Sequence, residues 1–337
     1  MKKIAMFDTK SYDKIWFDKV NTKYEIVYIE SRLNYKTAKL AEGCDVVCAF
    51  VNDCVNKKTI EILDEMGIHL LAMRCAGYSN VDFEAAHHRV HVVRVPAYSP
   101  YAVAEHTMAL LLTLNRKTHK AYNRTRDFNF SLNGLTGTVL HDKTIGVIGT
   151  GKIGRCFIDI CKGFGMHVIA YDLYPAKDLE VEYVSLDELF KRSDIISLHC
   201  PLTKETEYIL SKDAFSKMKK GVYIVNTSRG GLVDTDALID ALNNKTVAGA
   251  GLDVYEEEAA FFFEDRSDMI MKDDRLALLV SKPNVLLTSH QAFLAEEALE
   301  SIAKTTLSNI EAYFERGELN NQVVYITKEQ KIIEKRD

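Results

Sequence analysis

The sequence lacks the features that define several protein classes. No apolar run reaches the roughly 20 residues of a membrane-spanning helix, and the basic N-terminus is not followed by a signal-peptide core. A formal net charge of −5 gives no indication of nucleic-acid binding. The seven cysteines form no CxxC pair, which favours reduced thiols over disulfides or a zinc site. We therefore expect a cytoplasmic protein that holds no metal and binds neither membranes nor nucleic acids.

A glycine-rich turn lies in the middle of the chain, where Gly149, Gly151 and Gly154 follow the pattern GxGxxG. An apolar run at 144–148 precedes this turn, a helical pattern follows it, and a second apolar run ends at Asp172. Strand, turn, helix and terminal acid together are typical of a dinucleotide site. The acid would accept hydrogen bonds from ribose hydroxyls and repel a 2′-phosphate, which predicts NAD rather than NADP. The alternative is an ordinary βα turn with incidental glycines.

Apolar runs alternate with helical patterns in two separate stretches, the first hundred residues and the region from 144 onward. Such alternation predicts, in each stretch, a parallel sheet covered by helices. The first stretch has no glycine cluster in its first turn, so we expect the dinucleotide in the second. A long amphipathic helix is expected after Phe293 and could return the chain to the first domain. The charged tail at 328–337 is expected to be solvated or frayed.

Three strands of the second stretch are followed by polar residues that suit catalysis. Arg229 follows VYIVNTS, Glu256–Glu258 follow the run that contains Asp253, and His290 follows NVLLTS. Because the carboxyl ends of parallel strands meet at one edge of a sheet, we expect these groups to converge on the nicotinamide. Arginine can hold a substrate carboxylate, and histidine beside a carboxylate can exchange a proton at neutral pH. These are the groups that interconvert 2-hydroxy and 2-oxo acids, although each alone could be a solvated surface residue.

The chain resembles the D-isomer-specific 2-hydroxyacid dehydrogenase family up to about residue 328, and it is most similar to the bacterial fermentative D-lactate dehydrogenases. The matching stretches are FVND (50–53), RCAGYSNVD (74–82), VPAYSPYAVAEH (95–106), RTRDFNFSLNGLTG (124–137), IGTGKIG (148–154), SLHCPLT (197–203), NTSRGGLVDT (226–235), DVYEEE (253–258) and SHQAF (289–293). The resemblance implies a flavodoxin-like substrate domain at 1–99 and 294–337, a Rossmann NAD-binding domain at 100–293, and a cleft between them.

The resemblance also implies roles for single residues. Arg229 would bind the substrate, His290 would be the acid/base, and Glu258, rather than either preceding glutamate, would assist the histidine. Cofactor contacts are implied for Gly149, Gly151, Lys152, Ile153, Gly154, Asp172, His199, Cys200, Pro201, Thr227, Ser228 and Asp253. Substrate contacts are implied for Phe50, Ala76, Gly77, Tyr98, Arg229 and Phe293.

The implied reaction is the reversible reduction of pyruvate to D-lactate by NADH. The implied assembly is a homo-oligomer, a dimer or tetramer, that forms through the helix after Pro100. Two alternatives stay open: the same chemistry on a bulkier 2-oxo acid, and an NAD(H)-sensing platform similar to the C-terminal-binding corepressors. A phosphorylated substrate is disfavoured because Arg74 is the one basic residue of the RCAGYSN loop. The FVND and RTRDFNFSLNGLTG stretches favour the enzyme.

Overall fold

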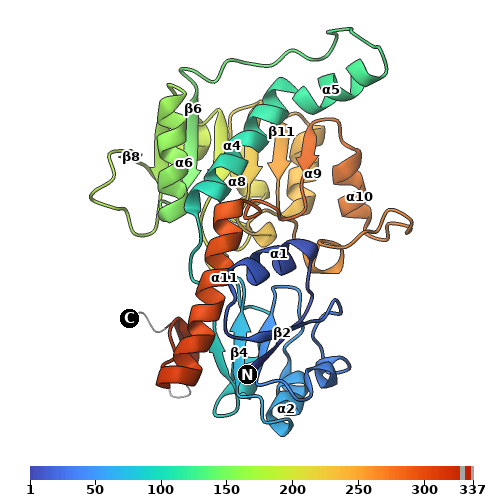
Figure 1. The fold of residues 1–337 in the computed structure, drawn as a ribbon. Coiled ribbons are helices and arrows are strands. Elements are labelled where there is room, and N and C mark those ends of the chain that lie inside the picture. Colours follow the sequence, from blue (N-terminus) through green and yellow to red (C-terminus); the bar gives the residue numbers. More distant parts are fainter. Residues whose placement is uncertain (327–330, 335–337) are drawn as a thin grey trace. The chain divides into compact units, whose positions relative to one another are not determined.

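The computed structural model describes residues 1–326 and 331–334, and the chain forms two compact α/β units. Unit 1 comprises Met1–Ser99 and Leu294–Asp337, and unit 2 comprises Pro100–Phe293 (Figure 1). Each unit contains a seven-stranded, mainly parallel sheet, which confirms the predicted fold class. None of the helices within the described ranges is long and apolar enough to cross a bilayer.

The sheet of unit 1 has the order β14-β13-β5-β4-β3-β1-β2. Its strands are β1 (Lys3–Met6), β2 (Glu25–Tyr28), β3 (Val46–Ala49), β4 (Leu70–Met73), β5 (His91–Val93), β13 (Gln322–Ile326) and β14 (Lys331–Glu334). The first five are parallel in the flavodoxin-like order 2-1-3-4-5, whereas β13 and β14 join antiparallel at the β5 edge. The expectation of a frayed tail is therefore wrong for residues 331–334, while 328–330 and 335–337 lie outside the described residues.

Two cores cover the faces of this sheet because neighbouring strand residues point to opposite sides. Val47 and Leu71 belong to one core, and their neighbours Val46 and Leu70 belong to the other. The helices of unit 1 are α1 (Ser11–Val20), α2 (Lys57–Glu65), α3 (Phe83–Ala86) and α11 (Glu296–Glu311), with short turns of helix at Ala38–Ala41 and Ala312–Arg316. The long helix expected after Phe293 is α11, and it packs against α1 and β4 within unit 1.

The sheet of unit 2 is parallel throughout and has the order β12-β11-β10-β9-β6-β7-β8. Its strands are β6 (Thr144–Ile148), β7 (His167–Tyr171), β8 (Glu182–Tyr183), β9 (Ile195–Leu198), β10 (Val222–Asn226), β11 (Val247–Leu252) and β12 (Val285–Leu287). The chain leaves β6 toward β7 and β8, then returns to continue from β9 on the other side. The switch point between β6 and β9 is where a doubly wound sheet binds its ligand.

Helices cover both faces of this second sheet (Figure 1). They are α4 (Pro100–Arg116), α5 (Thr118–Arg126), α6 (Lys152–Gly163), α7 (Leu186–Arg192), α8 (Lys212–Lys217), α9 (Thr235–Asn243) and α10 (Asp274–Ser281), with short 3₁₀ turns at Gly230–Leu232 and Glu258–Ala260. The helix α4 packs against α6 and against β10, β11 and β12. Its inner face is buried, whereas Tyr101, Glu105 and Ala109 on the other face are exposed.

Candidate active site

The glycine turn between β6 and α6 has the geometry that a dinucleotide requires. Gly149 has a φ of +99°, and a Cβ there would lie 2.6 Å from the backbone of Cys200. A Cβ at Gly154 would collide with the carbonyl of Gly149, so the first turn of α6 packs directly on the glycine turn. At Gly151, by contrast, a Cβ would meet no atom of the described residues within 4 Å. The turn is therefore closed toward the sheet and open where a pyrophosphate would approach the N-terminus of α6.

Asp172 lies just beyond the end of β7 and holds the glycine turn in place. Its Oδ2 accepts hydrogen bonds from the backbone N–H of Thr150 at 2.6 Å and from the Thr150 hydroxyl at 2.9 Å. Its Oδ1 accepts from the Tyr174 N–H at 2.9 Å. Burial raises the pKa of Asp172, but these hydrogen bonds outweigh it and lower the pKa overall. The residue is thus a carboxylate that has lone pairs left to accept further hydrogen bonds.

The segment after β9, residues 199–201, lies on the other side of the switch point between β6 and β9. The Nε2 atom of His199 lies 2.9 Å from the Ser197 hydroxyl, and burial lowers the pKa of this imidazole to about 3. Burial likewise raises the pKa of the Cys200 thiol to about 11. Both side chains are therefore neutral at physiological pH. They add no charge to this edge of the sheet, and Pro201 follows them directly.

The strongest candidate for a catalytic group is the pair formed by His290 and Glu258. The His290 Nδ1 lies 2.7 Å from Glu258 Oε1, and each side chain is 18% exposed. The second carboxylate oxygen, Oε2, accepts the N–H of Tyr255 at 3.1 Å, which fixes the glutamate. Because Nδ1 faces the carboxylate, Nε2 is the atom that can exchange a proton with a substrate. Of the three consecutive glutamates, Glu258 is the one whose carboxylate contacts the His290 ring.

Arg229 leaves the end of β10 in a turn that is fixed by Asn226. The buried Asn226 donates through Nδ2 to the Arg229 carbonyl at 2.8 Å and accepts the Ser228 N–H at 3.0 Å. The next residue, Gly230, lies so close to the backbone of Tyr255 that a Cβ there would collide with it. The arginine turn and the segment leading to Glu258 are therefore neighbours. The Thr227 hydroxyl lies 2.7 Å from the hydroxyl of Thr107 on α4. The Ser228 hydroxyl donates to the Cys200 carbonyl at 2.7 Å.

Asp253 follows β11, is completely buried, and organises the segment that carries His290. Its Oδ1 accepts from the Thr288 hydroxyl at 2.6 Å and the Gln291 N–H at 2.9 Å, while Oδ2 accepts the Ala292 N–H at 2.8 Å. The sequence analysis predicted that Asp253 contacts the nicotinamide, but it did not identify Thr288 and His106 beside it. His106 could have been found as the last residue of the matching stretch VPAYSPYAVAEH.

The substrate residues named from the sequence fall mainly in unit 1. Phe50 follows β3 and is buried with its ring 4.7 Å from the Arg74 guanidinium, whereas Phe293 ends unit 2. Ala76 and Gly77 form the turn after β4, where the Ala76 carbonyl accepts from Arg94 at 2.7 Å and the Gly77 carbonyl from the Cys75 thiol at 3.2 Å. Tyr98 lies in the last segment of this part of unit 1.

A buried ion pair lies at the end of β4, and the sequence analysis missed it. Arg74 is 1% exposed and donates from Nε and Nη2 to the two carboxylate oxygens of Asp13, each at 3.2 Å. Asp53 accepts the Phe50 and Leu33 N–H groups, each at 2.6 Å, and burial raises its pKa to about 6. The backbone at Phe50, directly after β3, is thus held by a buried carboxyl group.

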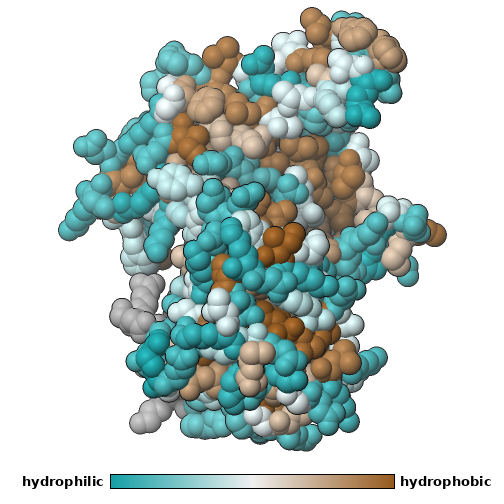
Figure 2. All heavy atoms as spheres, viewed as in Figure 1, coloured by the Kyte–Doolittle hydropathy of each residue, from teal (hydrophilic) through white to brown (hydrophobic). Residues whose placement is uncertain are grey.

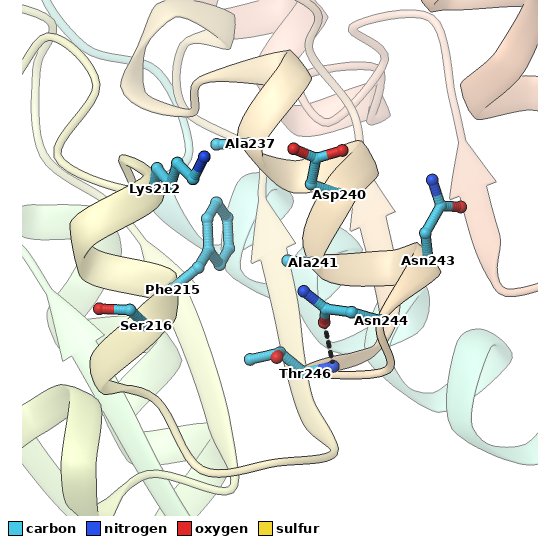
Figure 3. Close-up of a pocket in the computed structure, with 9 residues that line it drawn as sticks. All are labelled: Lys212, Phe215, Ser216, Ala237, Asp240, Ala241, Asn243, Asn244 and Thr246. Atoms are coloured by element: carbon cyan, nitrogen blue, oxygen red, sulfur yellow. Dashed lines mark hydrogen bonds between the residues drawn. The ribbon is translucent and has the colours of Figure 1, made fainter.

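An open pocket of about 530 Å³ in unit 2 lies away from these residues (Figure 3). It is lined by residues of α8, α9 and the turn that precedes β11, and Phe215 lies between the two helices. The groups described above follow the opposite, carboxyl ends of β10 and β11. The pocket is therefore separate from the catalytic edge of the sheet.

An NAD-binding sheet with a histidine–carboxylate pair and an arginine at its strand ends defines a dehydrogenase of 2-hydroxy acids. Residues 108–292 match the family model of the D-isomer specific 2-hydroxyacid dehydrogenase NAD-binding domain. The chain is 52% identical to D-lactate dehydrogenase of Escherichia coli over 94% of its length and 98% of the relative. The chain belongs to the D-isomer-specific 2-hydroxyacid dehydrogenase family, which confirms the resemblance seen in the sequence.

Solved structures give the same result. The pyruvate reductase of Chlamydomonas reinhardtii is 44% identical and superposes with a TM-score of 0.90, over 95% of this chain and 98% of that one. An NAD-complexed D-isomer specific 2-hydroxyacid dehydrogenase from Lactobacillus delbrueckii ssp. bulgaricus is 30% identical, with a TM-score of 0.80 over 95% and 99% of the two chains. The predicted cofactor, NAD, is confirmed by the family that the NAD-binding unit matches.

Proposed function

We propose that this enzyme is an NAD-dependent D-lactate dehydrogenase that reduces pyruvate reversibly to D-lactate. The observation that carries the proposal is the 2.7 Å contact between His290 and Glu258, beside the Arg229 turn, on the sheet edge where NAD-binding folds hold their ligand. The identity to D-lactate dehydrogenase of Escherichia coli supports pyruvate as substrate and the D configuration of the product. The substrate unit is assigned to 1–99 and 294–337, and the NAD-binding unit to 100–293.

Each side chain has a distinct task in this proposal. The Arg229 guanidinium would pair with the substrate carboxylate, because its planar fork matches two carboxylate oxygens. His290 would donate the proton from Nε2 to the carbonyl oxygen during reduction and take it back during oxidation. Glu258 would hold the imidazole and stabilise its charged form. NADH, when bound, supplies the hydride.

The other site residues would serve binding. Gly149, Gly151 and Gly154, with Lys152 and Ile153 at the start of α6, would surround the pyrophosphate, and Asp172 the ribose. Phe50, Tyr98 and Phe293 would provide the apolar wall that suits a methyl group, while the N–H groups of Ala76 and Gly77 would hold the carboxylate.

The test is a comparison of substrates. NADH oxidation is followed by absorbance with pyruvate, 2-oxobutyrate, 4-methyl-2-oxopentanoate, phenylpyruvate and hydroxypyruvate. We expect the highest kcat/KM with pyruvate and D-lactate as its product. A preference for a larger acid would keep the chemistry and reject the proposed substrate. Tight NADH binding without turnover of any of these acids would favour the NAD(H)-sensing platform instead.

We further propose that the enzyme works as a homo-oligomer in the cytoplasm. After α5 the chain runs outside the sheet of unit 2, and Phe128, Phe130 and Leu132 are 85%, 71% and 80% exposed there. Figure 2 shows hydrophobic side chains at the surface in this part of unit 2. A group of neighbouring exposed apolar side chains is typical of a protein–protein contact, and a second copy meeting α4, α5 and this segment would bury them. The seven cysteines form no CxxC pair in the sequence, which favours reduced thiols and therefore a reducing compartment.

Light scattering during gel filtration tests the assembly. We expect a dimer or a tetramer for the unmodified chain. Phe130→Asp should shift the population toward monomer, because it would place a charge in the contact. A matched substitution at the exposed Tyr174, which lies between β7 and β8, should leave the assembly unchanged. A monomer at micromolar concentration in the unmodified chain would contradict the proposal.

A further inference from the structure

The backbone of His290 has an unusual conformation that needs support. Its φ is +53°, in the left-handed region that residues with a Cβ rarely adopt. Its N–H donates to the carbonyl of Asp253 at 2.6 Å, and the next two N–H groups donate to the Asp253 carboxylate. A single buried residue thus holds three consecutive backbone amides of the catalytic segment. The direction of the His290 ring depends on where this carboxylate lies.

Two further side chains fix the carboxylate itself. The Thr288 hydroxyl donates to Asp253 Oδ1 at 2.6 Å, and His106 Nε2 lies 3.4 Å from the same oxygen and 3.3 Å from the Thr288 hydroxyl. His106 comes from α4, on the face of the helix turned toward β11 and β12. The imidazole, the hydroxyl and the carboxylate therefore form a closed triangle beneath the catalytic segment.

The residue next to His106 makes a parallel connection to the other catalytic strand. Thr107 is fully buried, and its hydroxyl lies 2.7 Å from that of Thr227, which comes two residues before Arg229. Consecutive residues of one helix therefore contact the strand ends that carry Arg229 and His290. Such a connection fixes the distance and orientation between Arg229 and His290. This is important because a small misplacement of a catalytic group lowers the reaction rate by a large factor.

We propose that His106 and Thr288 are positioning residues for His290, acting through the buried carboxylate of Asp253. The proposal rests on the proposed role of His290 as the acid/base. His106 and Thr288 hold the carboxylate, the carboxylate holds the amides of residues 291 and 292, and these hold the His290 ring toward the substrate. Without them the Asp253 carboxylate would lose two of its partners and the His290 ring could shift, so proton transfer would slow while binding survived.

The experiment uses paired substitutions in the full-length enzyme. Thr288→Val removes the hydroxyl at almost constant volume, and Thr288→Ser retains it. His106→Leu removes the ring nitrogens, and His106→Gln keeps a side-chain N–H. The control is His167→Leu, at an exposed histidine on β7 whose side chain is 69% accessible. For each variant we measure kcat, KM for pyruvate, the Kd of NADH, the melting temperature, and the isotope effect on kcat with NADH deuterated at the transferred hydrogen.

We expect kcat to fall roughly 10- to 100-fold in Thr288→Val and His106→Leu, with KM and the NADH Kd within about threefold of the parent. The isotope effect should rise in both because the chemical step becomes slower than product release. Thr288→Ser and His106→Gln should recover most of kcat, and His167→Leu should match the parent. Unchanged kcat in Thr288→Val and His106→Leu would overturn the proposal. It would also be overturned by a loss that Ser and Gln do not restore, since that would indicate packing alone.

His290→Ala separates this inference from the proposed function. If His290→Ala loses turnover while Thr288→Val and His106→Leu keep it, His290 is the acid/base and the positioning inference is wrong. If His290→Ala itself turns over normally, the proposed role of His290 is wrong, and the positioning inference is rejected with it.

Discussion

The contact between Glu258 and His290 makes the effect of Glu258→Gln calculable. The two groups are 2.7 Å apart and each side chain is 18% exposed, so a charge-assisted hydrogen bond would join them whenever the imidazole carries two protons. Hydrogen bonds to charged groups contribute about 1.5–3 kcal/mol. Since about 1.36 kcal/mol corresponds to a tenfold change in rate, kcat for pyruvate reduction should fall roughly 10- to 150-fold. Glutamine keeps the shape and one acceptor but removes the negative charge.

The assay is the rate of pyruvate reduction by NADH at saturating pyruvate and fixed pH. Glu257→Gln is the matched control, because Glu257 is exposed beside it. An unchanged rate in Glu258→Gln, or an equal effect of Glu257→Gln, would refute the reasoning.

Three other changes have defined outcomes. Asp172→Ala should lower the ratio of kcat/KM for NADH over NADPH by roughly tenfold or more, because it removes a carboxylate that repels a 2′-phosphate; an unchanged ratio would assign selectivity elsewhere. Gly149→Ala should destabilise the protein by about 1–3 kcal/mol, since its φ of +99° and the Cys200 backbone leave no room for a Cβ; calorimetry should show a lower Tm, and a parent-like Tm would contradict this. Asp253 has a pKa lowered overall in the folded state, because hydrogen bonds led by that of His106 outweigh burial. The contribution of the Asp253 carboxylate to the free energy of unfolding should be complete above about pH 4, the pKa of an unfolded aspartate. It should be lost as the pH falls through the lower pKa of the folded state. Urea unfolding of the parent and of Asp253→Asn should therefore differ most near neutral pH and converge in acid; a constant difference would contradict this.

The sequence was sufficient to predict the parts of the molecule in which local pattern determines structure. Gly149 and Gly154 lie where a Cβ would collide with the backbone, so the positions of these glycines in the sequence predict the geometry of the turn. Arg229 and His290 were predicted because strand ends of a parallel sheet share one edge. In each case a short stretch of sequence contains the physical reason for the structure.

The missed residues depend on contacts between distant parts of the chain. His106 and Thr288 are 182 positions apart, and nothing in either neighbourhood indicates that they meet. The buried ion pair between Arg74 and Asp13 was not predicted, because charged residues are normally expected at the surface. In the tail, two isoleucines are flanked by charges, and the strand β14 follows from pairing with β13 rather than from its own pattern.

The most direct test of the account is the turnover of His290→Ala with pyruvate, measured together with its affinity for NADH. The glycine turn and Asp172 are elsewhere in unit 2, so the NADH Kd should stay close to that of the parent. Turnover should fall by roughly 10²- to 10⁴-fold, because the proton donor is gone. A variant that binds NADH and still reduces pyruvate at nearly the parent rate would contradict the central claim that His290, held by Glu258, carries the proton.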